Sequence, residues 1–318
     1  MKRILVTGGA GYVGGAVTDI LRELNVDCLV YDNLTYERDY RKSIPFVYGD
    51  IRDHVKLSKI LNSYQPSSVI WLAALVGDGA CQVNPELTVE INQKPVEWLA
   101  ANYSGKIIFT STCSVYGKSE GLLTEESPTN PLSLYALTKL ACEQTLRDKN
   151  AVIFRLGTLY GISDTYSRIR LDLVVNILSV KAYLGEQLTI FGGNQWRPLL
   201  HVRDAAKAIA YAAIDSTPPG LYNITQKNIR IKEIGEGIKE FVKDRRLEIS
   251  YSEISVDDAR NYRVSYDKYK SLKTAQSFKL KIKDGVNEIY NLMKEHRIKD
   301  PFASVYHNQQ FNEEIYAK

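Results

Sequence analysis

With 318 residues, 44% of them hydrophobic and 25% charged, the chain has the composition of an ordinary globular protein that can bury a large core. Its 41 basic and 37 acidic residues give a net charge of +4. These charges are scattered along the chain rather than gathered in a basic stripe, so no nucleic-acid partner is expected. No apolar run approaches the roughly 18 residues of a membrane span, and no signal peptide is recognised, so we expect a cytoplasmic protein without membrane association.

The first predicted strand, residues 4–6, leads into a glycine-rich turn and a helix-like stretch. A turn of this kind between a buried strand and a helix holds the pyrophosphate of a dinucleotide, whose charge lies against the free N–H groups of the helix. Gly8 can supply the backbone freedom of a tight turn, Gly11 lets the main chain approach the ligand, and Gly14 lets helix and strand pack closely. A glycine cluster by itself is also compatible with a plain turn.

A second apolar run, residues 28–31, ends in Asp32-Asn33. In a dinucleotide-binding fold, a carboxylate at this position binds the adenosine ribose hydroxyls and repels the additional phosphate of NADP. We therefore expect NAD as the cofactor. The alternative for Asp32 is an ordinary turn aspartate.

Strand-like and helix-like segments alternate along the first half of the chain. The predicted strands are residues 4–6, 28–31, 69–72, 107–110 and 152–155, and the predicted helices lie near 13–24, 53–63, 86–102 and 134–148. This order predicts an α/β fold, a Rossmann-type doubly wound parallel sheet with a smaller C-terminal substrate-binding lobe. We expect an NAD-binding domain over 1–157, a substrate-binding lobe mainly over 158–298 with segments that contribute to the sheet, and a surface extension over 299–318.

The predicted strand 107–110 continues into Thr112, and 23 residues later come Tyr135 and, four positions on, Lys139. Residues four apart on a helix share one face. A lysine ammonium there favours the phenolate, lowering the pKa of Tyr135 so that it can act as a general base. Thr112 can hydrogen-bond the same substrate hydroxyl. Chance matches to this pair are common in a chain with 21 tyrosines, but its place after the glycine turn and Asp32 favours the functional interpretation.

In these features the chain resembles the extended short-chain dehydrogenase/reductase family, in its NAD-dependent nucleotide-sugar epimerase/dehydratase branch. The resemblance covers nearly the whole chain and weakens over the last 20 residues or so. It also rests on the segments 49–53, 71–74, 90–92, 154–161, 195–204 and 258–262.

The resemblance implies roles for individual residues. Thr112, Tyr135 and Lys139 match the catalytic triad. The implied cofactor-binding residues are Gly8, Gly11, Tyr12, Val13, Gly14, Asp32, Asn33, Asp50, Ile51, Leu72, Ala73, Ala74, Asn92, Thr110, Tyr135, Lys139 and Leu156. Arg197 and Arg260 match positions that bind the substrate's pyrophosphate, with a solvated surface charge as the alternative for each. Asn176 is a further candidate for the diphosphate, with a helix-surface asparagine as the alternative.

The implied reaction is hydride transfer from a sugar carbon, usually C4, to NAD while Tyr135 takes the hydroxyl proton. Sugar 4,6-dehydratases need an acid pair directly after the triad threonine, where this chain has Cys113-Ser114, and we expect Cys113 to be buried. The expected function is therefore that of a 4-epimerase or 4-dehydrogenase of a nucleoside-diphosphate sugar. A dehydratase with atypical acid and base residues and a non-catalytic NAD-binding regulatory protein remain as alternatives.

Three further expectations concern assembly, metals and one histidine. Homodimerisation is the family habit, through a contact that includes the Tyr135 helix. Four cysteines without Cys-x-x-Cys spacing or neighbouring histidines predict reduced thiols, with neither a metal site nor a disulfide framework. We expect His201 to be a packed, hydrogen-bonded residue rather than a catalytic one.

Overall fold

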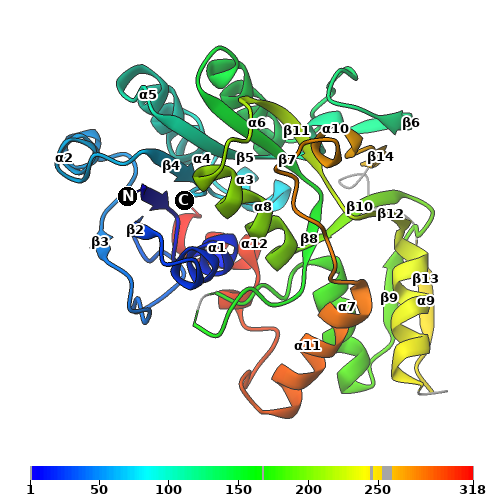
Figure 1. Ribbon diagram of the computed structural model, residues 1–318. Helices are drawn as coiled ribbons and strands as arrows, with labels where there is room; N and C mark the ends of the chain where they lie inside the picture. The colour runs from blue at the N-terminus through cyan, green and yellow to red at the C-terminus, as the bar shows by residue number, and fades with distance from the viewer. Residues whose placement is uncertain (1, 167, 244–245, 253–259, 318) are drawn as a thin grey trace.

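A computed structural model describes residues 2–166, 168–243, 246–252 and 260–317 (Figure 1). Within them, seven parallel strands form one sheet in the order β11-β7-β5-β4-β1-β2-β3. The strands are β1 (Arg3–Thr7), β2 (Asp27–Asp32), β3 (Phe46–Tyr48), β4 (Ser68–Trp71), β5 (Lys106–Thr112), β7 (Ala151–Leu156) and β11 (Gly220–Ile224). The predicted Rossmann-type parallel sheet is thus confirmed.

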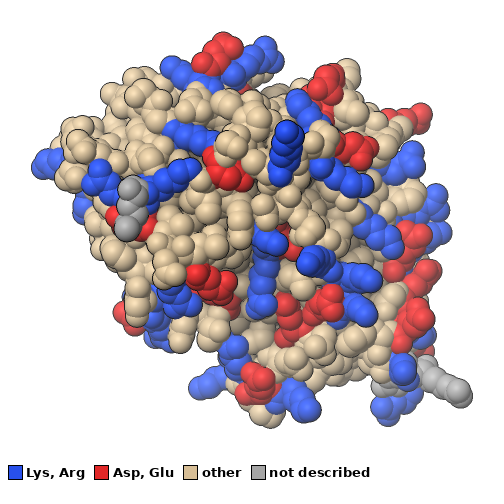
Figure 2. All heavy atoms as spheres, in the orientation of Figure 1, with Lys and Arg blue, Asp and Glu red and all other residues tan. Residues whose placement is uncertain are grey.

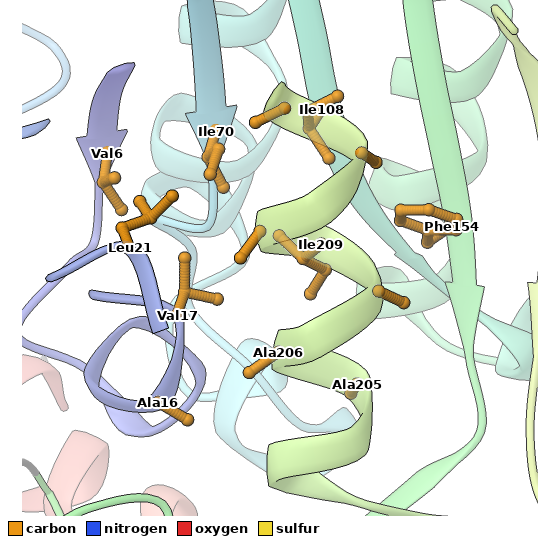
Figure 3. Packing of buried hydrophobic residues seen from close by; sticks show 14 of the residues in the cluster. Val6, Ala16, Val17, Leu21, Ile70, Ile108, Phe154, Ala205, Ala206 and Ile209 are labelled. Atoms are coloured by element: carbon orange, nitrogen blue, oxygen red, sulfur yellow. The ribbon is translucent and has the colours of Figure 1, made fainter. Parts of the chain in front are cut away.

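Helices cover both faces of this sheet. They are α1 (Tyr12–Glu23), α2 (His54–Tyr64), α3 (Asp78–Gln82), α4 (Pro85–Asn92), α5 (Lys94–Asn102), α6 (Leu134–Leu146) and α8 (Val202–Ile214). Successive residues of a strand point to opposite faces, so Val6 packs with α1 and α8 whereas Leu5 packs with α2, α5 and α6. Figure 3 shows the first of these layers, with Val17 of α1 and Ile209 of α8 packed toward Ile70.

A smaller lobe is built from the second half of the chain together with one earlier strand. It contains β8 (Thr158–Tyr160), β10 (Trp196–His201) and β12 (Lys227–Arg230), the pairs β9 (Leu188–Phe191) with β13 (Ile249–Ser252) and β6 (Lys118–Leu123) with β14 (Asn261–Val264), and the helices α7 (Val174–Leu184), α9 (Ile231–Val242) and α11 (Ile282–Lys294). The short α10 (Asp267–Lys270) packs instead against the central sheet, where Tyr269 contacts Phe154 of β7. Both α8 and β11 come from this half of the sequence but belong to the central sheet layers, which is the interleaving that the sequence suggested.

One expectation about the elements is wrong. The single helix expected near 86–102 is two helices, with α4 ending at Asn92 and α5 beginning at Lys94. The break arises because Pro95 has no N–H group to bond the carbonyl oxygen of Ile91, four residues earlier, and its ring crowds that carbonyl. The C-terminal segment expected as a surface extension forms a short 3₁₀ turn (Ser304–Tyr306) and α12 (Asn308–Tyr316). The side chains of Asn308 and Asn312 are buried against the rest of the molecule.

The surface and the helices add two observations. Figure 2 shows Lys and Arg interspersed with Asp and Glu on the displayed face, so the basic excess forms no single patch there.

Among the described residues, no helix combines the length and apolar character needed to cross a bilayer.

Candidate active site

A cavity of about 1880 Å³ runs along the carboxyl ends of the central strands. Ligands of open parallel sheets bind at this edge, and the volume exceeds the roughly 300–1,000 Å³ typical of a single small-ligand pocket. There is therefore room for a dinucleotide and a second large ligand together. Of the residues predicted for catalysis, cofactor and substrate, all except Asn92 and Asn176 line this cavity.

The glycine-rich turn has no space for side chains at two of its three positions. Gly8 has a φ of +75°, and a Cβ there would lie 2.6 Å from the Ala73 nitrogen. A Cβ on Gly14 would lie 2.1 Å from the Gly8 carbonyl oxygen. Helix α1 starts directly after Gly11 without a side-chain cap, so the N–H groups of its first turn are available to an anion. The turn thus fits a dinucleotide pyrophosphate.

Asp32 ends β2 and is tied to the glycine turn. One carboxylate oxygen accepts a hydrogen bond from the Ala10 N–H at 3.0 Å, and the other accepts one from the Leu34 N–H at 2.8 Å. The second bond is that of an ordinary turn aspartate, but the first fixes the carboxylate beside the predicted pyrophosphate site. Burial raises the pKa of Asp32, while these backbone hydrogen bonds lower it.

The predicted catalytic residues lie on adjacent elements at one wall of the cavity. Thr112 is the last residue of β5, and its hydroxyl accepts a hydrogen bond from the Ser114 N–H at 3.1 Å. Ser133 caps the N-terminus of α6 and so places Tyr135 in the first turn of that helix. One turn later, the buried Lys139 ammonium donates a hydrogen bond to the Thr110 carbonyl oxygen at 2.9 Å.

The expected effect of Lys139 on Tyr135 is not the dominant one. Burial raises the pKa of the Tyr135 phenol, and the nearby Arg170 guanidinium opposes that rise. Lys139 Nζ lies 6.0 Å from the Tyr135 ring centroid, and burial lowers the pKa of the lysine. Desolvation of the phenol thus opposes the expected lowering of its pKa by the Lys139 ammonium.

Two predicted site residues are buried behind the cavity instead of lining it. Asn92 exchanges two hydrogen bonds with the backbone of Leu75, at 2.8 and 2.9 Å, and so supports the loop after β4 from the neighbouring helix. Asn176 accepts from the Gly161 N–H at 2.9 Å and donates to the Arg170 carbonyl oxygen at 2.7 Å. Because these backbone groups occupy its amide, the prediction that Asn176 contacts a diphosphate is corrected to a supporting role.

The residues after Thr112 face in different directions. Cys113 is buried, as predicted, and its thiol donates to the Arg155 carbonyl oxygen at 3.4 Å; burial raises its pKa. Ser114 lines the cavity, with its hydroxyl 3.3 Å from that of Tyr262. Neither side chain is the acid or base that water elimination requires.

One of the two predicted arginines, Arg260, pairs with a carboxylate that the sequence analysis did not assign to the site. Arg197 donates to the backbone carbonyl oxygen of Arg260, which brings the two residues together on the cavity wall. The Arg260 guanidinium pairs with Asp78 at 2.8 Å, and Asp78 also accepts from the Ser133 hydroxyl at 2.6 Å. Asp78 is the first residue of α3, in the loop after β4. A carboxylate that follows a predicted strand lies at the carboxyl edge of the sheet, and this position was the sequence signal that could have identified Asp78 as a site residue. Residues 258 and 259 of the same predicted motif lie outside the described residues.

The segment before α7 supplies two more cations. Arg168 is buried, and Arg170 makes a two-point contact with Asp172 at 3.0 and 2.8 Å. Both arginines line the cavity, so this segment is a wall of the site. His201 is fully buried, accepts from the Arg203 N–H and contacts Glu288 at 3.0 Å, which confirms its packing role.

No grouping of histidine, cysteine and carboxylate side chains suited to a metal ion occurs in the described part of the chain. The four cysteines are free thiols, and each is buried.

The fold and the cavity together define a dinucleotide-dependent α/β enzyme. A model of the NAD dependent epimerase/dehydratase family matches residues 4–225. A putative UDP-glucose 4-epimerase of Methanocaldococcus jannaschii is 30% identical over 312 residues, covering 92% of this chain and 98% of that protein. The chain therefore belongs to the NAD dependent epimerase/dehydratase family.

Solved structures share this fold at lower identity. UDP-glucose 4-epimerase of Thermotoga maritima, solved with UDP-glucose, gives a TM-score of 0.81 at 23% identity, over 93% of this chain and all of that one. The dTDP-glucose 4,6-dehydratase of Bacillus anthracis, solved with NAD, gives 0.78 at 22% identity, over 93% and 97%. Epimerases and dehydratases thus have the same fold, and the choice between their reactions depends on the site.

Proposed function

We propose that this chain uses NAD to oxidise the C4 hydroxyl of a nucleoside-diphosphate sugar, as a 4-epimerase or a 4-dehydrogenase. The observation that carries the proposal is that Thr112, Tyr135 and Lys139 line the same cavity as the glycine turn and Asp32. A proton acceptor beside a dinucleotide site is what oxidation of an alcohol requires. A protein that only sensed NAD would not need it.

The residues at one end of the cavity fit NAD. The first turn of α1 would hold the pyrophosphate, and Asp32 would accept hydrogen bonds from the adenosine ribose. Asp50 and Ile51 would flank the adenine; the Arg52 guanidinium, hydrogen-bonded to Asp50 at 2.9 and 2.7 Å, lowers the pKa of that carboxyl and keeps it charged. When bound, NAD supplies the acceptor of the sugar's hydride.

The other end of the cavity provides cations for the substrate. Arg197 and Arg260 present planar, permanently charged forks that match a diphosphate. In binding it, Arg260 would exchange its contact with Asp78 for the stronger charge of the diphosphate. Asp78 would then accept a hydrogen bond from a sugar hydroxyl near Tyr135, held in place by Ser133.

The proton step belongs to Tyr135, with Thr112 orienting the same hydroxyl. Because burial raises the pKa of the phenol, the base form is the minority species at neutral pH. The cations that favour it are Arg170, which lowers this pKa, and Lys139 one helical turn away. Oxidation of the hydroxyl then leaves a 4-keto sugar, which is either released or reduced on its other face.

A panel of nucleotide sugars that includes UDP-glucose and UDP-galactose tests this proposal. A 4-epimerase interconverts a C4 pair without net formation of NADH, and a 4-dehydrogenase accumulates NADH in proportion to product. Absence of turnover across the panel, together with tight NAD binding, would instead support the regulatory alternative.

A 4,6-dehydratase is the second candidate, and one observation favours it: Asp78 places a carboxylate in the cavity, 2.6 Å from the residue that caps the Tyr135 helix. Elimination of water needs a base at C5 and an acid at the C6 hydroxyl. If Asp78 serves there, product formed in deuterium oxide carries deuterium at C5 or C6. A product without solvent deuterium at those carbons leaves the C4 reaction alone.

We also infer that two copies pair through α6. Leu137 on this helix is 51% exposed, whereas Leu146 is buried against the sheet. The inference rests on the contact that the family resemblance implies for this helix, and Leu137 is the exposed apolar side chain that a second copy would cover. Sedimentation of the wild type and of Leu137→Lys tests it, with a monomeric wild type as the contradicting result.

A further inference from the structure

The C-terminal segment, residues 299–317, returns from α11 to the central sheet and packs against the rim of the cavity. Figure 1 shows this red segment running back from the orange α11. Asn308 and Asn312 are 3% and 0% exposed, so their amides are removed from water. The Asn312 amide donates to the Ala80 carbonyl oxygen at 3.1 Å, and the Asn308 amide donates to that of Val76. Both acceptors lie in the loop and helix after β4.

The same segment also contacts two further parts of the cavity wall, the loop after β2 and the segment before α7. Phe311 packs on Tyr36, with ring centroids 4.8 Å apart, and Tyr36 follows Asp32 by four residues. The Arg168 guanidinium lies 3.5 Å above the Tyr36 ring and donates to the Asn308 side chain. One short stretch of chain thus joins the loop after β2, the loop after β4 and the segment before α7.

This segment also faces the cavity itself. Gln309, Glu313 and Tyr316 line it, with Gln309 beside Gly79 in α3. Phe311 on Tyr36 ties the same segment to the loop after Asp32, where the adenosine ribose would be held. The buried amides make the contact specific, because separating them from their carbonyl partners leaves polar groups unpaired in the interior. The segment is therefore a fixed wall of this end of the site.

We propose that the C-terminal segment is part of the cofactor site and retains NAD between turnovers; this inference rests on the proposed function. For the adenosine half of NAD to leave, the segment must detach from Val76, Ala80 and Tyr36. Slow release suits an enzyme that returns the hydride to its own product and regenerates NAD in place. It does not suit a dehydrogenase, which exchanges its cofactor in every cycle. Retention of NAD would thus favour 4-epimerisation within the proposed function.

Release of labelled NAD into an excess of unlabelled NAD tests the inference. Holoenzyme of the wild type is expected to keep its label over many turnovers. The double substitution Asn308→Ala with Asn312→Ala should release the label at least about tenfold faster, since each lost hydrogen bond at a buried site contributes up to about a factor of ten. Ile315→Ala is the matched control, because Ile315 lies on α12, is 56% exposed and does not line the cavity.

A second variant, Phe311→Leu, removes the ring contact with Tyr36 but leaves both buried amides in place. It should also release NAD faster, so the test does not depend on the fold of the double variant. Equal release rates for wild type, Phe311→Leu and Ile315→Ala would overturn the inference, as would wild-type release of NAD within one turnover. If retention fails while C4 chemistry is observed, only this inference falls; if no nucleotide sugar turns over, the proposed function falls.

Discussion

Lys139 lies one helical turn beyond Tyr135, and its ammonium donates a hydrogen bond to the backbone carbonyl oxygen of Thr110 on β5. Its Nζ is 6.0 Å from the centroid of the Tyr135 ring. The lysine therefore locks α6 to β5, which fixes the tyrosine against the carboxyl edge of the sheet. Burial of the phenol, which raises its pKa, is the larger influence on the protonation of Tyr135.

The first prediction concerns pH. A general base works in its deprotonated form, and a raised pKa makes that form scarcer at neutral pH. We expect kcat/KM for the nucleotide sugar to rise as pH increases from neutral into the alkaline range. A pH–rate profile of the wild type measures this, with Tyr103→Phe as the control, since Tyr103 bonds the Pro66 carbonyl oxygen outside the site. A profile already flat at neutral pH would contradict the raised pKa.

The second prediction concerns the glycine turn. A Cβ on Gly14 would lie 2.1 Å from the Gly8 carbonyl oxygen, so Gly14→Ala must displace the turn. We expect weaker NAD binding by at least about tenfold and a loss of about 1–3 kcal/mol in the free energy of unfolding. Gly237→Ala on α9 is the control because its Cβ meets open space. That change should leave NAD binding intact and stabilise the helix by up to about 1 kcal/mol. Titration with NAD and urea unfolding measure both.

The third prediction concerns Asp78. Asp78→Asn keeps the shape of the side chain but removes its negative charge. In the wild type this charge pairs with Arg260 and raises the pKa of Tyr135. We expect kcat/KM for the nucleotide sugar to fall by about tenfold, as for one lost charge-assisted hydrogen bond, with NAD affinity unchanged. The pH profile should also move toward lower pH. The exposed Asp148→Asn serves as a control, and an Asp78→Asn variant with wild-type kinetics would remove Asp78 from the sugar site.

Local signals in the sequence predicted the sheet and most of the cavity wall. Apolar runs between helical stretches located β1, β2, β4, β5 and β7, since parallel strands are buried on both faces. The glycine spacing predicted the turn, and the close contact at Gly14 is with Gly8 and Gly9, which are near in sequence. The close contact at Gly8 is with Ala73, which only the folded sheet brings near. The Tyr135–Lys139 spacing placed both side chains on one face of a helix in the same way.

Features that depend on distant contacts could not be predicted. Asn176 and Asn92 look like site residues in a motif, and only the folded backbone shows that Gly161 and Leu75 occupy their amides. Asp78 acquires its place in the site from Arg260, far along the chain. The C-terminal segment has no strong periodic pattern, and its buried contacts to α3 arise only once the sheet has formed.

The central claim is that the enzyme removes a hydride from C4 while Tyr135 removes the proton. Single-turnover reduction of bound NAD, by whichever nucleotide sugar of the panel reacts, tests it most directly when the sugar carries deuterium at C4. We predict slower NADH formation with the deuterated sugar, and a further loss of about 10²- to 10⁴-fold in Tyr135→Phe with NAD still bound. Equal rates for the two sugars, with Tyr135→Phe as fast as the wild type, would contradict the claim.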